Sequence, residues 1–534
     1  MKNDYPALTL ATIACLLPFA FKAFHIDDTF YLYCAQHVCS DLFDFYGFSM
    51  NWYGNTEPVA DFKKNPPLVC YYIAAVASLL GWGEAGLHIA FLIPAVAAIT
   101  GTRALARSFT GSPSLAAAVA LLTPAFLVSA TGIMCDVMML AFWVWAVFFW
   151  IKAQETQRIG FFLAAGCLIA LGFLTKYFAI AILPLMVVYS LLSDRRSTRW
   201  LVAVAVVVLV VGAYEAYTHA LYGRGLFLEA MRYTDQVRDL RGNRAIIRIP
   251  AAVLFLGGGF ASAIFITPFL WGRRILAGMA ALALLTFLLP YEALARETGQ
   301  PLPYSLRFSL HVVGFVFMAL NLVALVVSDL LVRRDRAAIL LALWVGGVFF
   351  FAMALNWTVS MRNLLPMLPA VGILLARRLE DRELGIPRMR AARIAIVAGG
   401  ALSFVVAQGD AALAATGRDA ARGFAEKFEA FRGSVRFEGH WGFQYYMAER
   451  GFEPLEMAGI IAQRGDRLIK PDHNTSTYAP PEEHYRLDKV VGLRPRSFAS
   501  TMSSGAGFYS SLWGSAPFVI GPPRPVLFEI WVIR

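Results

Sequence analysis

Residues 200–218 read WLVAVAVVVLVVGAYEAYT, an apolar run long enough to cross a lipid bilayer as a helix. A membrane span needs roughly 20 mostly apolar residues, and we expect about 13 such helices in this chain. They lie near residues 7–24, 87–106, 112–131, 137–151, 159–174, 177–192, 200–218, 249–270, 275–291, 308–331, 337–355, 363–376 and 394–410. The sequence therefore predicts an α-helical polytopic membrane protein.

The composition of the whole chain agrees with this class. Of the 534 residues, 58% are apolar and 16% are charged, whereas soluble globular proteins are about 45–50% apolar and about 25% charged. A soluble enzyme, a disordered chain and a secreted disulfide scaffold are excluded. Six scattered cysteines are too few for a disulfide framework or a zinc site. We expect no cleavable signal peptide, because the run at 7–24 is long enough to remain as the first span.

Lysine and arginine predict the orientation, because positive residues in short loops mark the cytoplasmic side. With a cytoplasmic N-terminus, alternate loops carry the positive residues, for example the arginines at 195–199 and 333–336. The net charge of +11 is thus assigned to these loops, and we expect no nucleic acid partner. An odd number of spans places the C-terminal region on the outer side.

Two segments on the outer side are large. Residues 25–86 form a polar and aromatic first outer loop, in which the short apolar run 68–80 is expected to be an interfacial or re-entrant helix. Residues 411–534 are expected to fold as an extracytoplasmic α/β domain beside a transmembrane domain at 1–410. Its predicted strands are 434–438, 467–470, 489–492 and 526–533, and its predicted helices are 418–431 and 443–449.

Ionisable residues gather at the outer ends of the expected spans, where charge is costly and marks functional sites. They are Asp27, Asp28, Lys63, Lys64, Asp136, Lys176, Glu215, His219 and Arg362. Structural roles stay open for several of them: Asp136 as a helix cap, Lys176 as a snorkelling lysine, and Arg362 as a headgroup anchor. Glu215 and His219 are more readily structural, and Lys63 and Lys64 could contact lipid phosphate. A functional role is favoured for the Asp27–Asp28 pair.

Common catalytic motifs are absent from the sequence. No glycine-rich phosphate loop follows a predicted strand, and Gly257-Gly258-Gly259 lies in a span, where it favours helix packing. H-E-x-x-H, C-x-x-C and G-x-S-x-G are also missing. Because nucleotide-activated substrates are scarce outside the cytoplasm, the energy for chemistry there would arrive on a membrane lipid.

Several short motifs, in their order, resemble those of the GT-C glycosyltransferases, in the bacterial branch of protein O-mannosyltransferases and the aminoarabinose transferase of lipid A. After the first span come His25-Ile26-Asp27-Asp28-Thr29-Phe30-Tyr31, Lys64-Asn65-Pro66-Pro67-Leu68, Met134-Cys135-Asp136, Thr175-Lys176-Tyr177 and Arg362-Asn363-Leu364-Leu365-Pro366. The sequence departs from the family pattern at three positions: Asp28 replaces a glutamate, Asn65 is inserted, and Tyr177 replaces a glycine. These departures leave the branch and the sugar open.

The resemblance implies a GT-C-like fold and a membrane-bound hexosyl- or pentosyltransferase. Such an enzyme takes a sugar from a polyprenyl-phosphate carrier to a lipid, glycan or protein acceptor, with inversion at the anomeric carbon. A bacterial inner membrane location follows, with the C-terminal domain in the periplasm and membrane lipids as partners. The resemblance implies substrate contacts from Tyr31 and Tyr72.

The chemistry assigns roles to the charged residues. A carboxylate must take the acceptor's proton, and Asp27 is the first candidate, with Asp28 and Asp136 as further catalytic carboxylates. Cations must stabilise the leaving phosphate, and Lys64, Lys176 and Arg362 are the candidates. The sequence requires no cofactor, although two acids beside a phosphate could also bind Mg²⁺ or Mn²⁺.

Two alternatives have a different physical basis. A transporter or flippase of lipid-linked sugars would share the spans and the outer charges, but should carry polar groups at mid-membrane. A scaffold for envelope assembly would leave the clustered charges unexplained. We further expect the C-terminal domain to tune acceptor choice without a catalytic group, with His440 and Trp441 in packing roles. Cys34 and Cys39 should share one helix from about Thr29 and not bridge each other, whereas a bridge between Cys39 and Cys70 stays open if the first loop folds back.

Overall fold

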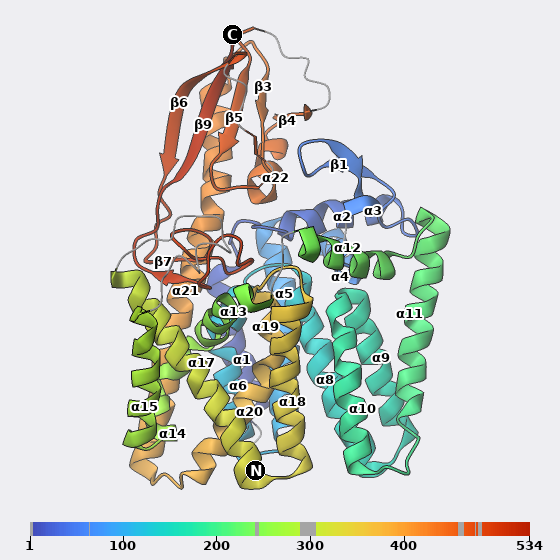
Figure 1. The fold of residues 1–534 in the computed structure, drawn as a ribbon. Helices are drawn as coiled ribbons and strands as arrows, with labels where there is room; N and C mark the ends of the chain where they lie inside the picture. Colours follow the sequence, from blue (N-terminus) through green and yellow to red (C-terminus); the bar gives the residue numbers. More distant parts are fainter. Residues whose placement is uncertain are drawn as a thin grey trace.

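The computed structural model describes residues 4–62, 65–240, 245–288, 306–457, 464–475, 477–478 and 483–534. Figure 1 shows a helical bundle with a small β-sheet above one end. The N-terminus lies at the opposite end of the bundle, and the C-terminus lies at the far tip of the sheet. This arrangement agrees with a chain that crosses a membrane an odd number of times.

Six described helices are long and apolar enough to cross a membrane, and the bent pair α6 and α7 would make a seventh. The six are α5 (Glu84–Ala106), α8 (Cys135–Thr156), α11 (Leu201–Tyr222), α17 (Leu306–Arg333), α18 (Arg336–Phe350) extended by η5 (Phe351–Leu355), and α21 (Ile386–Phe428). The bent pair is α6 (Pro113–Leu121) and α7 (Pro124–Ala130), which meet at 63°. The polytopic helical class is confirmed, whereas the expected number of about 13 full-length spans is not established.

Shorter helices occupy the other expected spans. They are α1 (Tyr5–Leu16) with η1 (Leu17–Phe19), α9 (Ile159–Thr175), η2 (Tyr177–Ala181) with α10 (Ile182–Ser193), α13 (Ala245–Gly259) with η3 (Ala261–Phe265) and α14 (Thr267–Leu270), α15 (Arg273–Leu284) with η4 (Leu285–Leu288), and α19 (Met361–Leu364) with η6 (Leu365–Met367) and α20 (Leu368–Asp381). Hydropathy identifies these segments because residues that face lipid are apolar whatever the exact course of the backbone. Hydropathy does not show where a predicted span is interrupted into two shorter helices.

Close helix packing explains the glycine triplet in α13. A Cβ atom on Gly257 would lie 1.7 Å from the Phe315 carbonyl oxygen of α17, and one on Gly259 would lie 2.5 Å from the sulfur of Met361. Small residues allow such close approach between membrane helices. The predicted packing role of this triplet is confirmed.

The first outer loop forms short elements across the top of the bundle, beside α12 (Leu226–Leu240) (Figure 1). They are α2 (Asp28–Ser40), the hairpin β1 (Ser49–Asn51) and β2 (Thr56–Pro58), α3 (Val59–Phe62) and α4 (Leu68–Leu80). The predicted helices near Thr29 and at 68–80 are confirmed. Cys34 and Cys39 lie together on α2, as predicted, and all six cysteines are free in this structure.

The C-terminal region contains a five-stranded sheet in the order β4-β3-β5-β9-β6. The strands are β3 (Val435–Phe437), β4 (Glu453–Pro454), β5 (Arg467–Pro471), β6 (Tyr485–Leu493) and β9 (Val526–Ile533), and α22 (Trp441–Glu449) follows β3. β3 runs parallel to β4 and β5, and β9 is antiparallel to β5 and β6. The predicted strands and the helix near 443–449 are confirmed.

A single helix joins the bundle to the sheet. α21 continues without interruption from Ile386 to Phe428, so the expected boundary at residues 410 and 411 falls inside it. Phe424 on α21 and Phe443 on α22 both contact Phe528 of β9, at ring distances of 5.7 and 5.2 Å. A second link is the loop 501–518 between β7 (Ala499–Ser500) and β8 (Val519–Ile520), which returns to the top of the bundle (Figure 1).

Candidate functional site

Four of the predicted residues meet at the top of the bundle. Lys176 Nζ lies 2.7 Å from Asp136 Oδ1. Arg362 Nη1 lies 3.2 Å from Asp27 Oδ2 and 3.8 Å from Asp136 Oδ2. Two carboxylates and two cations, far apart in sequence, therefore form one ionic cluster, which we call the outer cluster.

Each member of the outer cluster stands at the end of a helix. Asp27 immediately precedes α2, and Asp136 lies in the first turn of α8, where the helix dipole favours negative charge. Lys176 is the first residue after α9, and Arg362 lies in the short helix α19. Lys176 Nζ also donates a hydrogen bond to the side-chain oxygen Oδ1 of Asn363, the residue after Arg362, at 3.1 Å. Helix ends thus fix all four side chains at one level.

Exposure falls steeply across the outer cluster. The exposed side-chain fractions are 37% for Asp27, 18% for Arg362, 15% for Lys176 and 2% for Asp136. Asp136 is thus a buried counter-ion for both cations, and Asp27 is the carboxylate that an incoming molecule can reach. The described hydrogen bonds use Lys176 Nζ twice and Arg362 only through Nη1. An ammonium group has three donors and a guanidinium has five, so both cations retain donors that could bind an anion.

Asp28 has a different environment from its neighbour. It is fully buried, and its two oxygens accept hydrogen bonds from the backbone N–H groups of His25 (3.0 Å) and Ile133 (2.9 Å). Burial raises the pKa of this carboxyl to about 6. Asp28 thus joins the loop before α2 to the loop before α8, and its side chain is not exposed to solvent.

The other predicted residues lie at varied distances from this chemistry. The Tyr31 hydroxyl donates to Cys135 Sγ at 3.1 Å and accepts from Asn65 Nδ2 at 3.3 Å, beside Asp136. The Tyr72 hydroxyl donates to the Ala90 carbonyl at 2.7 Å, which packs α4 against α5. Lys63 and Lys64 lie outside the described residues.

Glu215 and His440 have local structural contacts. Glu215 Oε1 accepts from the backbone N–H of Leu228 at 2.6 Å, which joins α11 to α12. His440 is buried, its Nε2 is 2.8 Å from Thr475 Oγ1, and its ring packs 4.8 Å from that of Trp52. Burial lowers the pKa of His440 to about 3.

No group of three or more His, Cys, Asp or Glu residues that could hold a metal ion occurs among the residues that the structure describes. Both oxygens of Asp28 are engaged by backbone N–H groups, so they do not pair with Asp27 as a chelate. Binding of Mg²⁺ or Mn²⁺ by acidic side chains together with a bound phosphate stays a prediction.

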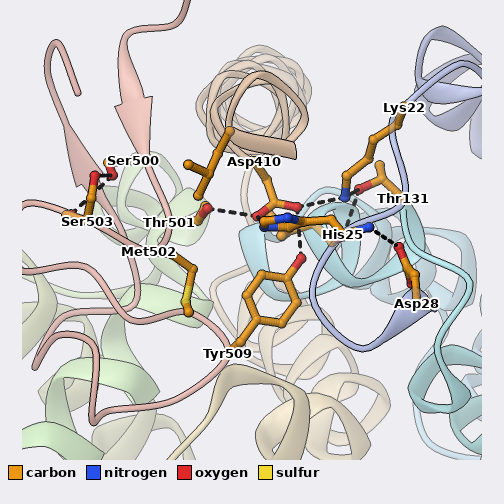
Figure 2. Close-up of polar contacts among 12 residues, drawn as sticks. Lys22, His25, Asp28, Thr131, Asp410, Ser500, Thr501, Met502, Ser503 and Tyr509 are labelled. Atoms are coloured by element: carbon orange, nitrogen blue, oxygen red, sulfur yellow. Dashed lines mark hydrogen bonds and ion pairs between the residues drawn. The ribbon is translucent and has the colours of Figure 1, made fainter. Parts of the chain in front are cut away.

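Sequence reasoning missed a second cluster, which Figure 2 shows around Asp410 of α21. Asp410 is fully buried, and its carboxylate contacts Lys22 Nζ (2.7 Å), Thr501 Oγ1 (2.7 Å) and the Tyr509 hydroxyl (2.8 Å). Lys22 also donates to Thr131 Oγ1 at 3.0 Å. We call these groups the sealed cluster. Its signal in the sequence is a lysine and an aspartate inside two apolar spans, a costly placement that demands partners.

Comparison with known proteins supports the resemblance. Residues 64–216 match the family model described as dolichyl-phosphate-mannose-protein mannosyltransferase. The matched segment includes Asp136 and Lys176, and it confirms the predicted resemblance to GT-C mannosyltransferases over these residues. No curated protein matches the sequence.

Two solved structures have a similar backbone arrangement. The structure of ArnT from Cupriavidus metallidurans bound to undecaprenyl phosphate is 14% identical, with 88% of this chain and 92% of that chain covered and a TM-score of 0.47. Arabinofuranosyltransferase AftD from Mycobacteria is 14% identical, with a TM-score of 0.39, and this chain spans 40% of its length. Neither similarity assigns a role to a residue of this chain.

Proposed function

We propose that this protein is a membrane glycosyltransferase that transfers a sugar from a polyprenyl-phosphate carrier to a hydroxyl of an acceptor outside the cytoplasm. The observation that carries the proposal is the outer cluster. The accessible carboxylate of Asp27 lies 3.2 Å from the guanidinium of Arg362. Arg362 and Lys176 both pair with the buried carboxylate of Asp136. The family match at 64–216 supports a polyprenyl-phosphate sugar as the donor class.

The reaction needs one bond made and one bond broken. The acceptor oxygen attacks the anomeric carbon, and the bond from that carbon to the carrier phosphate breaks with its electron pair on the phosphate. Asp27 takes the hydroxyl proton as the general base, a role typically worth 10²–10⁴-fold in rate. Lys176 and Arg362 stabilise the charge that grows on the phosphate.

Arg362 links the two ends of this charge movement. In the resting site it pairs with Asp27. When Asp27 receives the proton its charge is neutralised, while the phosphate gains negative charge. The arginine can therefore exchange one anion for the other without leaving its place beside Asp136, and this gives stronger binding in the transition state than in the ground state.

The location of the charges favours an enzyme over a transporter. Transporters bind their substrates near the bilayer midplane, commonly at broken helices. In this chain the outer cluster lies at helix ends on the side of the sheet. A periplasmic location and a role of residues 411–534 in acceptor choice are parts of the same proposal.

The test uses the purified protein in liposomes with a radiolabelled synthetic polyprenyl-phosphate sugar and an envelope extract from a strain that lacks the gene. We expect label to move into the extract with the wild-type protein and not with Arg362→Ala. Lys152→Ala is the matched control, because Lys152 pairs with Glu155 in an exposed position at the other end of α8. Movement of the intact labelled lipid between leaflets without transfer would establish the flippase and overturn the proposal.

A further inference from the structure

The C-terminal loop 501–518 reaches the outer cluster through a single ring. Tyr509 is buried, and the guanidinium carbon of Arg362 lies 5.3 Å from the centroid of its ring. A cation over an aromatic face is held by the ring quadrupole. The same loop fixes the backbone of α19, because the Met361 N–H donates to the Phe508 carbonyl at 2.9 Å. Arg362 is therefore held by a residue of the C-terminal region.

Tyr509 is in turn held by the other members of the sealed cluster. Its hydroxyl donates to Asp410 Oδ2 at 2.8 Å, and the same oxygen accepts from Lys22 Nζ at 2.7 Å (Figure 2). The ring of His25 packs against Tyr509 edge to face at 5.7 Å. A buried carboxylate is tolerated only when it is paired and hydrogen-bonded, so this arrangement has little freedom to move. The order of contacts runs from Asp410 to Tyr509 to Arg362.

We propose that Tyr509 is a positioning residue for Arg362, and that Asp410 acts through Tyr509. The proposal rests on the proposed function, since Arg362 must be the phosphate-binding cation for its position to matter. It makes the loop 501–518 a structural part of the donor site. It also gives this loop a different role from the five-stranded sheet. Among the described hydrogen bonds and ion pairs, none joins the sheet to Asp27 or Asp136.

Binding of a polyprenyl phosphate without a sugar is the direct readout, because it needs no acceptor. Tyr509→Leu removes the ring face and should weaken binding by severalfold, up to about thirtyfold, because the full strength of the cation–π contact to Arg362 sets the upper limit. Tyr509→Phe keeps the ring face and loses only the hydrogen bond to Asp410, so it should weaken binding less. Tyr509→Met, which fills similar space without a ring, should behave as Tyr509→Leu and serves if that variant does not fold.

A double-mutant cycle separates positioning from general destabilisation. If Tyr509 acts through Arg362, the double variant Tyr509→Leu with Arg362→Ala should bind no more weakly than Arg362→Ala alone. The matched control is Tyr446→Leu. Tyr446 is also a buried tyrosine between the C-terminal region and the bundle, and its hydroxyl donates to Glu84 Oε1 at 2.5 Å. Its loss should lower the melting temperature and leave polyprenyl-phosphate affinity unchanged.

The outcomes distinguish the two proposals. If Arg362→Ala weakens binding while folded Tyr509→Leu and Tyr509→Met do not, the positioning role is overturned and the proposed function stands. Full additivity in the cycle overturns it in the same way. If Arg362→Ala and Lys176→Ala both leave the affinity for polyprenyl phosphate unchanged, the donor site itself is overturned and the positioning role is lost with it.

Discussion

The outer cluster and the sealed cluster use the same chemical groups in opposite ways. In the outer cluster, Asp27 is 37% exposed, and within the described chain Asp136 Oδ2 and Arg362 Nε lack hydrogen-bond partners. In the sealed cluster, both oxygens of Asp410 accept hydrogen bonds and none of its side chain is exposed. An accessible carboxylate beside cations is what a reaction needs, and a buried carboxylate with both oxygens hydrogen-bonded is what a fixed joint needs.

The comparison teaches that a buried charge is not by itself a sign of catalysis. Asp27 and Asp28 are adjacent, yet one faces a cation at the surface and the other faces two backbone N–H groups. The two aspartates differ in their hydrogen-bond partners and in their exposure to solvent, and substitution of each residue tests the consequences of both differences. The predictions below test this division from the largest expected effect to the smallest.

The largest effect should come from Asp27→Asn. It removes the base and keeps the shape, so transfer should fall by about 10²–10⁴-fold, while the affinity for polyprenyl phosphate stays close to that of wild type. The measurement is transfer from the synthetic polyprenyl-phosphate sugar, with donor binding followed separately. Near-normal turnover would move the catalytic role to Asp136, and lost donor binding would make Asp27 a binding residue.

Stability should show the reverse order. Asp410→Ala leaves Lys22 charged and without its buried partner, which should cost about 3–5 kcal/mol. Asp27→Ala breaks a partly exposed pair, which should cost less than about 1 kcal/mol. Thermal unfolding in detergent measures both. Adding Lys22→Met to Asp410→Ala should restore part of the loss, because the uncompensated charge is gone. Equal losses for the two aspartates would contradict the division.

Much of the fold could be predicted from the sequence, because apolar runs and Lys/Arg placement follow directly from the bilayer. The helix 68–80, the strands of the C-terminal region and the free cysteines of α2 also follow from local pattern. The continuity of α21 past residue 410 could not be predicted by hydropathy, since the outer half of that helix is polar. The number of full-length spans stays a prediction for a related reason: a broken helix and a straight one have the same composition.

The site could be predicted in part. Asp27, Asp136, Lys176 and Arg362 each follow an apolar run, and helix ends at one membrane level bring them together. The sequence could not separate Asp28 from Asp27, because the partner of Asp28 is the backbone of Ile133, more than a hundred residues away in the chain. Tyr509 was missed for the same reason, because its contacts join distant segments and leave no local pattern. Asp410 does leave a signal, a charge within an apolar span, but that signal does not identify its partners.

A smaller effect is expected from Lys176→Gln. Removing one donor to a developing oxyanion typically costs about 10²–10³ in turnover. Donor binding should weaken as well, by about tenfold, because a hydrogen bond to phosphate also exists in the ground state. The same transfer and binding measurements apply. If only turnover changed, Lys176 would act on the transition state alone, and if neither changed, its ion pair with Asp136 would be structural.

Asn substitution at the two adjacent carboxylates sharpens the comparison further. Asp28→Asn replaces one acceptor by an NH₂ group that must face a backbone N–H, either of His25 or of Ile133, so one buried donor is left unsatisfied. Such a group costs about 1–3 kcal/mol, and the melting temperature should fall. Asp27→Asn faces no backbone donor in the described contacts and should melt near the wild-type temperature. The opposite order would contradict the assignment of the two backbone hydrogen bonds to Asp28.

The smallest effect concerns pH. Burial lowers the pKa of His25 to about 3, with Asp410 opposing that shift and Lys22 and His473 adding to it. An unfolded histidine has a pKa of about 6.5. The unfolded state therefore binds the proton first, so stability is complete above about pH 6.5 and declines as pH falls towards 3. The slope is at most about 1.4 kcal/mol per pH unit for each such group.

His440 is the matched control, because burial lowers its pKa to the same value of about 3, whereas His25 alone of the two lies beside Asp410, at 3.8 Å. Melting temperatures between pH 7.5 and 5.5 should fall on acidification. His25→Gln and His440→Gln should each reduce that fall, and the double variant should reduce it most.

Because neither ring contacts an outer-cluster side chain through a described hydrogen bond, the affinity for polyprenyl phosphate at pH 7.5 should stay unchanged in His440→Gln. In His25→Gln it should change only as far as Tyr509 moves, since the ring of His25 packs on Tyr509. An unaltered slope in both variants would mean that the two histidines keep ordinary pKa values, and that the region around Asp410 admits water.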